Sequence, residues 1–178
     1  PFESTKYSFI QAIKSSFKAV VLPTRICKMS YTGYVFVSNI ESANVAMRKA
    51  LDLFANVRPV KIPEENIDWT FFRENTEGAY AVGSKGVDVD GELAFDFVVT
   101  TTEGTERIAR IAYDYAKRNG KERVSIINKA NVIKTTDGKF LNLCKDVAKD
   151  YPDITTDEWY IDITTAKLID KKRRTDFK

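Results

Sequence analysis

Histidine is absent from this 178-residue sequence. Its absence excludes Ser-His-Asp and Cys-His catalysis within the chain, and it removes a common ligand of catalytic zinc. Acid–base chemistry must therefore fall to lysine, tyrosine, aspartate or glutamate side chains. A metal bound by such carboxylates would be a hard cation, Mg²⁺ or Mn²⁺.

Cysteine is scarce, and long apolar runs are missing. Cys27 and Cys144 are too far apart in sequence to form a zinc motif or a disulfide framework. This usage indicates a reducing compartment, the cytoplasm or the mitochondrial matrix of a eukaryote. No apolar run approaches the roughly 20 residues that cross a bilayer, so we expect no membrane association. The first residue is Pro1 and no signal-peptide pattern follows, so we expect the chain to start within a longer protein.

Strong charge of one sign is also lacking. Twenty-eight basic and 25 acidic residues give a net charge of +3, which argues against a nucleic-acid partner. The longest basic run, residues 171–174, is interpreted as a solvated helix end. With 43% hydrophobic residues, the chain is long enough for one domain with a substantial core.

Hydrophobic periodicity predicts an α/β fold with a mixed sheet flanked by helices. Predicted helices lie at 5–17, 43–55 after a Ser42 cap, 103–119 before Gly120, from an Asp137 cap onward, and 163–174. Predicted strands lie at 19–22, 69–73, 79–82, 124–127 and 159–161, and residues 34–37 are a further candidate. A strand of about 9 residues runs through Leu93 and Val99 after a turn at Asp90-Gly91. The segment 79–101 therefore reads as a hairpin or an extended arm.

Three arginines stand at positions that favour a common cleft. Arg48 lies on the 43–55 helix, Arg58 follows it, and Arg73 ends the 69–72 strand. A single arginine in such a place is more often a surface ion pair. Three convergent guanidinium groups would instead suit a substrate with two or three carboxylates. Ser42 and Asn44, at the start of the helix, would add hydrogen-bond donors.

Tyr80, Lys129 and Asp162 are candidates for proton transfer. Lys129 follows the 124–127 strand and Asp162 follows the 159–161 strand. A packed tyrosine and a solvated lysine are the ordinary alternatives. Partial burial would lower the pKa of a lysine toward the range useful for catalysis. In a chain without histidine, tyrosine and lysine form a natural acid–base couple.

Four segments of the sequence resemble motifs of the metal-dependent β-decarboxylating dehydrogenases, which include isocitrate, homoisocitrate and 3-isopropylmalate dehydrogenases. They occur in the family's order at residues 42–59, 72–80, 128–138 and 160–162. Residues 23–41 depart from the short Gly-, Pro- and Thr-rich loop that the family usually has there.

The resemblance implies roles for the candidate residues. Five would bind the substrate carboxylates: Ser42, Asn44, Arg48, Arg58 and Arg73. Ser42 and Asn44 would contact the carboxylate that distinguishes isocitrate.

The resemblance also implies the chemistry. Tyr80 would protonate the enol carbon, Lys129 would help remove the hydroxyl proton, and Asn131 would lie near the nicotinamide of NAD or NADP. Asp162 would be one ligand of Mg²⁺ or Mn²⁺. Lys129 and Asp162 would reach into a partner's cleft, so the resemblance implies a homodimer with shared active sites, in which the hairpin or arm serves in dimerisation.

The expected function is oxidative decarboxylation of isocitrate, a tricarboxylate, to 2-oxoglutarate and CO₂. The alternatives are a homoisocitrate or 3-isopropylmalate dehydrogenase, a non-catalytic regulatory subunit, and an unrelated α/β binding module. We expect residues 1–41 to belong to a larger domain, 42–162 to form the smaller substrate-binding and dimerisation domain, and 163–178 to return to the larger domain. The residues that distinguish NAD from NADP would follow residue 178.

Overall fold

The computed structural model describes residues 43–83, 85–170 and 172–177. The chain divides into two compact units, residues 1–53 and 54–178. The elements predicted at 5–17, 19–22 and 34–37 lie outside the described residues, as does Ser42.

In the first unit the structure describes helix α2 (Ala43–Ala50). The helix starts where predicted but ends before the predicted boundary at 55. Asp52 takes a left-handed conformation with φ 46°, and the Leu53 amide donates to the Arg48 carbonyl at 2.8 Å. This pattern closes a helix with a left-handed residue, and Phe54 therefore lies beyond the helix.

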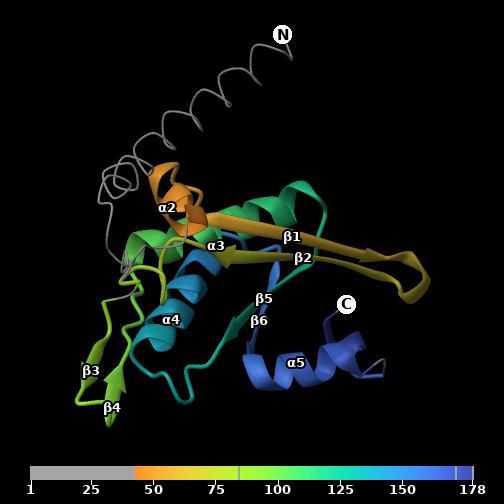
Figure 1. Cartoon of the computed structure of the whole chain (residues 1–178). Helices are drawn as coiled ribbons and strands as arrows, with labels where there is room; N and C mark the ends of the chain where they lie inside the picture. The colour runs from red at the N-terminus through yellow and green to blue at the C-terminus, as the bar shows by residue number, and fades with distance from the viewer. Residues whose placement is uncertain (1–42, 84, 171, 178) are drawn as a thin grey trace, which may run out of the picture. The chain divides into compact units, whose positions relative to one another are not determined.

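The strands of the second unit form three separate two-stranded sheets (Figure 1). β1 (Ala55–Ile62) pairs antiparallel with β2 (Ile67–Glu74) across a short 3₁₀ turn, η1 (Pro63–Glu65). β3 (Val87–Val89) and β4 (Leu93–Phe95) pair antiparallel, whereas β5 (Arg123–Asn128) and β6 (Thr155–Tyr160) pair parallel. The predicted α/β class, with parallel and antiparallel pairing, is confirmed.

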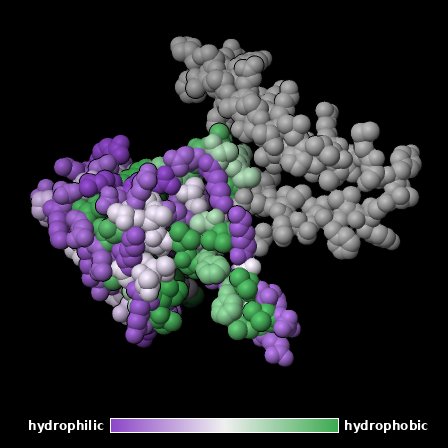
Figure 2. Space-filling model, turned by 90° about the vertical axis from the view of Figure 1, so that its left-hand side faces the viewer, coloured by the Kyte–Doolittle hydropathy of each residue, from purple (hydrophilic) through white to green (hydrophobic). Residues whose placement is uncertain are grey.

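The predicted turn at Asp90-Gly91 joins β3 to β4. Both residues have positive φ, 53° and 72°, and the Glu92 amide donates to the Val89 carbonyl at 3.1 Å. Two consecutive positive φ values are typical of the type I′ turn, whose twist suits a hairpin. The β3–β4 hairpin carries exposed apolar side chains. Figure 2 shows the side of the molecule on which this hairpin lies, where hydrophobic and hydrophilic surface occur together.

Two strand predictions in this segment are wrong. β4 ends at Phe95, and of the residues beyond it Val99 alone pairs, in an isolated bridge with Gly78. Residues 79–82 form turns. Apolar alternation supplies the side chains of a strand but not a neighbouring backbone to pair with, and Phe97 is 51% exposed.

Helix α3 (Thr102–Arg118) confirms the prediction for 103–119. Thr101 caps its start by accepting a hydrogen bond from the Gly104 amide at 3.0 Å. At its end Gly120 has φ +60°, and the Lys121 amide donates to the Ala116 carbonyl at 2.9 Å. Gly120 is therefore the predicted glycine that follows the helix end.

The core lies between α3, α4 (Thr136–Ala148) and β5. Its buried members are Ala109, Tyr113, Ala116, Ile126, Cys144, Val147 and Ile154. The Tyr113 ring stacks on Tyr151 at 5.0 Å, and its hydroxyl is 2.8 Å from the Thr156 hydroxyl. Burial raises the pKa of the Cys144 thiol to about 12, which makes this cysteine an inert core residue.

Helix α5 (Ile161–Ile169) follows β6 without a loop. Ile161 was predicted to end the strand, but it is the first helical residue. The helix predicted for 163–174 ends at Ile169 and is followed by a 3₁₀ turn, η2 (Arg174–Phe177).

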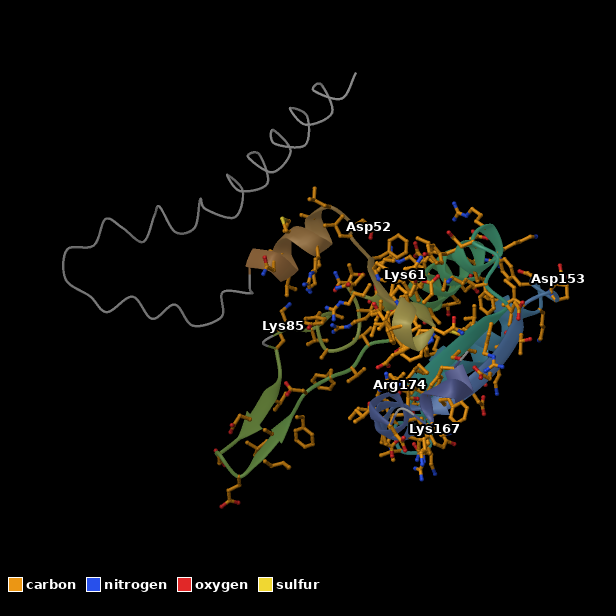
Figure 3. All side chains as sticks on the ribbon, turned by 90° about the vertical axis from the view of Figure 1, so that its right-hand side faces the viewer. Asp52, Lys61, Lys85, Asp153, Lys167 and Arg174 are labelled. Atoms are coloured by element: carbon orange, nitrogen blue, oxygen red, sulfur yellow. The ribbon has the colours of Figure 1, made fainter. Side chains whose placement is uncertain are left out.

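The C-terminal segment is tied to the rest of the unit. The Trp69 indole donates to the Phe177 carbonyl at 3.2 Å, and Arg174 pairs with Glu65. The ammonium of Lys167 lies 4.1 Å from the centre of the Trp159 ring, and Figure 3 labels both Lys167 and Arg174. In the basic run, Lys172 and Arg173 are exposed, Arg173 pairs with Asp170, and Arg174 is half-buried. Among the described residues, none of the helices is long and apolar enough to cross a membrane.

Candidate functional site

The β1–β2 hairpin places two of the predicted arginines on one face. Asn56 is opposite Arg73, and Arg58 is opposite Phe71. Residues that are opposite each other, or two apart on one strand, share a face of a sheet. Arg58 and Arg73 are therefore diagonal neighbours, and the Arg58 Nε–H donates to Asn56 Oδ1 at 3.0 Å.

The other face of the hairpin packs against α3. The Phe72 ring lies 5.2 Å from the Tyr115 ring, and the Thr70 hydroxyl donates to the Tyr115 hydroxyl at 3.3 Å. Because alternate residues of a strand point to opposite faces, this packing turns Arg58 and Arg73 away from α3.

The turn after β2 is held by two glutamates. The Glu74 carboxylate accepts hydrogen bonds from the amides of Thr76, at 2.9 Å, and Glu77, at 2.5 Å. Arg107 of α3 approaches Glu74 at 3.6 Å and donates to the Thr76 hydroxyl at 2.9 Å.

Glu77 extends this anchoring to the start of α3. Its carboxylate accepts from the Thr101 amide at 3.0 Å and from the Thr101 hydroxyl. The glutamates of the segment 73–80 thus fix the backbone that carries Arg73 and Tyr80. The sequence alone assigns these glutamates no part, because their partners Thr101 and Arg107 lie far along the chain.

Arg73 and Tyr80 contact each other at the mouth of this turn. Arg73 Nη2 donates to the Tyr80 hydroxyl oxygen at 3.2 Å, and the guanidinium carbon is 5.4 Å from the ring centre. Because the phenolic oxygen accepts from a cation, its own proton is directed elsewhere, and a phenolate formed there would be stabilised. This arrangement suits a proton donor.

Asn44 and Arg48 belong to the first unit, on α2. They are four residues apart, so they share one face of the helix. Arg48 is half-buried and Asn44 is exposed. The convergence of Arg48 with Arg58 and Arg73 remains a prediction, and so does the contribution of Ser42.

The second group of candidates lies at the carboxyl ends of β5 and β6. Asn128 and Tyr160 are paired and end the two strands. Lys129 follows the first, Asp162 follows the second, and Lys129 Nζ is 2.8 Å from Asp162 Oδ1. The hydrogen bond from Lys129 lowers the pKa of Asp162 below the ordinary carboxyl value. Ligands of parallel α/β sheets commonly bind at this edge.

The turn that carries Lys129 is fixed by side chains on both sides. Asn128 Oδ1 accepts from the Ala130 amide at 2.9 Å, and Asp137 Oδ2 accepts from the Lys129 amide at 2.7 Å. Asp137 was predicted to cap α4, but it is the second helical residue, and its carboxylate binds the preceding turn. Asn131 is exposed on this turn.

The donor set for a metal is incomplete within the described residues. Among them no three His, Cys, Asp or Glu side chains cluster at one point. The Asp162 side chain is 61% exposed and offers hard oxygen atoms, as Mg²⁺ and Mn²⁺ prefer. Asp162 therefore fits as a single ligand of such a cation and not as a complete metal site.

A cavity of about 540 Å³ lies between β2, α3 and β5, with Phe177 among its lining residues. None of the predicted site residues lines it. Arg58 and Arg73 instead lie on one face of the β1–β2 hairpin, and Tyr80 lies on the turn after β2. The remaining candidates of the second unit lie at the carboxyl ends of β5 and β6.

Comparison with known proteins places this geometry in a family. A family model described as isocitrate/isopropylmalate dehydrogenase matches residues 10–177. The chain is 40% identical over 141 residues to a mitochondrial regulatory subunit of the NAD isocitrate dehydrogenase of Dictyostelium discoideum, a match that covers 75% of this chain and 39% of that protein. It is 41% identical over 131 residues to the 3-isopropylmalate dehydrogenase of Archaeoglobus fulgidus, covering 70% and 39%.

A catalytic subunit is as similar as these relatives. The NAD isocitrate dehydrogenase catalytic subunit 5 of Arabidopsis thaliana is 42% identical over 134 residues, covering 72% of this chain and 35% of that protein. The solved structure of isocitrate dehydrogenase from Methylococcus capsulatus superposes with a TM-score of 0.68 and 36% identity, covering 80% of this chain and 44% of that one. The chain therefore spans less than half the length of each of these relatives. The family match over residues 10–177 confirms the predicted resemblance, and this chain belongs to the isocitrate/isopropylmalate dehydrogenase family.

Proposed function

We propose that the protein containing this chain oxidatively decarboxylates isocitrate to 2-oxoglutarate and CO₂, with NAD⁺ as the hydride acceptor. The observation that carries the proposal is the pairing of Arg73 with Tyr80 beside Arg58. Guanidinium groups that would bind carboxylates lie there beside a hydroxyl group that would donate a proton. NAD is preferred over NADP because the isocitrate dehydrogenase relatives from Dictyostelium and Arabidopsis are NAD enzymes by name.

The arginines would bind the substrate. Asn56 engages the Nε–H of Arg58, and the Arg58 side chain is exposed, so its two Nη groups would make a bidentate carboxylate contact. Arg73 would bind a second carboxylate beside Tyr80. Arg48 would also bind the substrate carboxylates, and Ser42 and Asn44 would contact the carboxylate by which isocitrate differs from 3-isopropylmalate.

Tyr80 would act as the acid. Loss of CO₂ leaves an enolate carbon that must take up a proton, and the Tyr80 hydroxyl can supply it because its oxygen is already bound by Arg73. The same guanidinium would stabilise the phenolate that forms.

Lys129 would assist removal of the substrate hydroxyl proton, and its Nζ lies 2.8 Å from Asp162 Oδ1. Asn131 would contact the nicotinamide, and Asp162 would supply one ligand to Mg²⁺ or Mn²⁺. When bound, the cation would polarise the hydroxyl and keto oxygens and NAD⁺ would accept the hydride.

Arg58, Arg73 and Tyr80 form one group of candidates, and Lys129 and Asp162 form another at the ends of β5 and β6. The separation of the two groups within the second unit supports a site that is shared between subunits. Lys129 and Asp162 would complete the cleft of a partner subunit. The exposed apolar β3–β4 hairpin would contribute to that contact, and residues 42–162 would form the substrate-binding and dimerisation domain. A homodimer and a heteromer of related subunits are distinguished by the mass of the assembly. The mitochondrial matrix, a reducing compartment, would suit the two cysteines, and the Dictyostelium and Arabidopsis relatives are named as mitochondrial.

A regulatory subunit is the second candidate function, and the 40% identity to a protein named as a regulatory subunit favours it. The presence of Tyr80, Lys129 and Asp162, to which the family resemblance assigns roles in the chemistry, favours catalysis instead. The test is spectrophotometric: the polypeptide containing this chain is supplied with Mg²⁺, NAD⁺ and one acid at a time. We expect NADH from isocitrate. Turnover of homoisocitrate or 3-isopropylmalate alone would reassign the substrate. No turnover alone, but altered turnover by a catalytic partner on mixing, would establish the regulatory role.

A further inference from the structure

Lys129 depends on a carboxylate eight residues further along the chain. Asp137 Oδ2 accepts a hydrogen bond from the Lys129 amide at 2.7 Å. This is short for an N–H donor, as expected for a charged acceptor.

The position of Asp137 on α4 explains why a carboxylate serves here. It is the second residue of the helix, where the helix dipole favours a negative charge. Thr135 precedes the helix and makes no side-chain capping bond. The Asp137 carboxylate therefore joins the start of α4 to the end of β5.

The surrounding bonds leave the Lys129 backbone little freedom. Its carbonyl accepts from the amides of Val132, at 3.0 Å, and Ile133, at 2.9 Å. Asn128, 5% exposed, closes the neighbouring turn through the Ala130 amide. With amide and carbonyl held, the Lys129 side chain starts from one defined direction and ends on Asp162 at 2.8 Å.

We propose that Asp137 is a positioning residue for Lys129. The proposal rests on the proposed function, in which Lys129 handles the substrate hydroxyl proton. Asp137 does not touch the substrate; it fixes the backbone from which the lysine reaches. A displacement of about 1 Å in a reacting group can lower a rate by about 100-fold.

The kinetic test compares variants of the polypeptide that contains this chain. Asp137→Ala should lower kcat by about 10- to 100-fold and change KM by less than about 3-fold, because carboxylate binding is untouched. Asp137→Asn should retain most of the activity, since the amide oxygen can still accept from Lys129. Asp150→Ala is the matched control. Asp150 lies just after the end of α4 and pairs with Arg110 of α3, so this substitution should leave kcat unchanged.

The double variant separates positioning from general stability. If Asp137 acts through Lys129, Asp137→Ala should add little to the loss caused by Lys129→Ala. Full additivity of the two losses, or an unchanged kcat in Asp137→Ala, would overturn the proposal.

A readout without turnover uses amide hydrogen exchange in the polypeptide that contains this chain. The Lys129 amide should exchange at least about tenfold faster in Asp137→Ala, since it loses a hydrogen bond to a charged group, and Asp150→Ala should not alter it. Unchanged Lys129 exchange in Asp137→Ala would overturn the proposal. If Lys129→Ala left turnover intact, the proposed function would fail instead, and the exchange result would still report whether Asp137 holds the turn.

Discussion

Gly104 and Gly138 occupy equivalent places, the third residue of α3 and of α4, yet substitution by alanine should have opposite effects. At Gly138 an added Cβ meets nothing within 4 Å. At Gly104 an added Cβ would overlap the carbon and both oxygens of the Glu77 carboxylate group. Real Cβ atoms do not approach other atoms so closely, so Glu77 must move.

The magnitudes follow from the contacts. Alanine in place of glycine favours a helix by up to about 1 kcal/mol, and Gly138→Ala should gain most of that. Gly104→Ala should gain the same amount but displace Glu77 from the Thr101 amide and hydroxyl. Losing two hydrogen bonds at an exposed site costs about 2 kcal/mol in total. The net loss at Gly104 is therefore about 1 kcal/mol, a fall in Tm of about 2–4 °C.

Thermal denaturation followed by circular dichroism, with urea titration as a second measurement, tests the prediction. In a Glu77→Ala background, which removes the obstructing carboxylate, Gly104→Ala should become neutral or stabilising. If Gly104→Ala stabilised the unaltered chain as much as Gly138→Ala does, the anchoring role assigned to Glu77 would be refuted.

Three further outcomes concern the site. Tyr80→Phe should lower kcat far more than it raises KM, because only the protonation step loses its donor; an unchanged turnover number would contradict the acid role. Arg73→Lys should raise KM or the isocitrate Kd by about tenfold, because an ammonium cannot replace a bidentate fork, and calorimetry would detect the change. Lys129→Met should return the pKa of Asp162 toward its ordinary value of 3.8, measured by carboxyl NMR. Since the folded pKa is lowered, the stability gained from the pair is full above that value and is lost as pH falls through the lowered pKa. Wild type and variant should therefore differ near neutral pH and converge in acid.

Local patterns predicted most of the elements that carry the site. The apolar run 69–72 marked β2, whereas its partner β1 was not among the predicted strands. Strand periodicity then puts Arg58 and Arg73 on one face once the register is known. Lys129 and Asp162 were predictable as neighbours because each follows a strand, and strands joined through a helix run parallel.

Bonds between distant segments were not predictable. Glu77 meets Thr101 across 24 residues, and Asp137 bonds backward to Lys129 instead of capping its own helix. The sequence gives the type and spacing of the residues, but it does not give the hydrogen-bond partner of a side chain when that partner comes close only through folding of the chain. The strand predicted through Val99 was too long for the same reason. Side-chain alternation does not reveal which backbone pairs with a strand, and β4 ends at Phe95.

The most direct test of the central claim is a titration of the ¹⁵N-arginine-labelled polypeptide with isocitrate, followed through the assigned guanidinium signals. We predict that the signals of Arg48, Arg58 and Arg73 shift together with a single Kd. Signals of Arg58 and Arg73 that stay unmoved at saturating isocitrate, or that respond with separate affinities, would contradict a common carboxylate site.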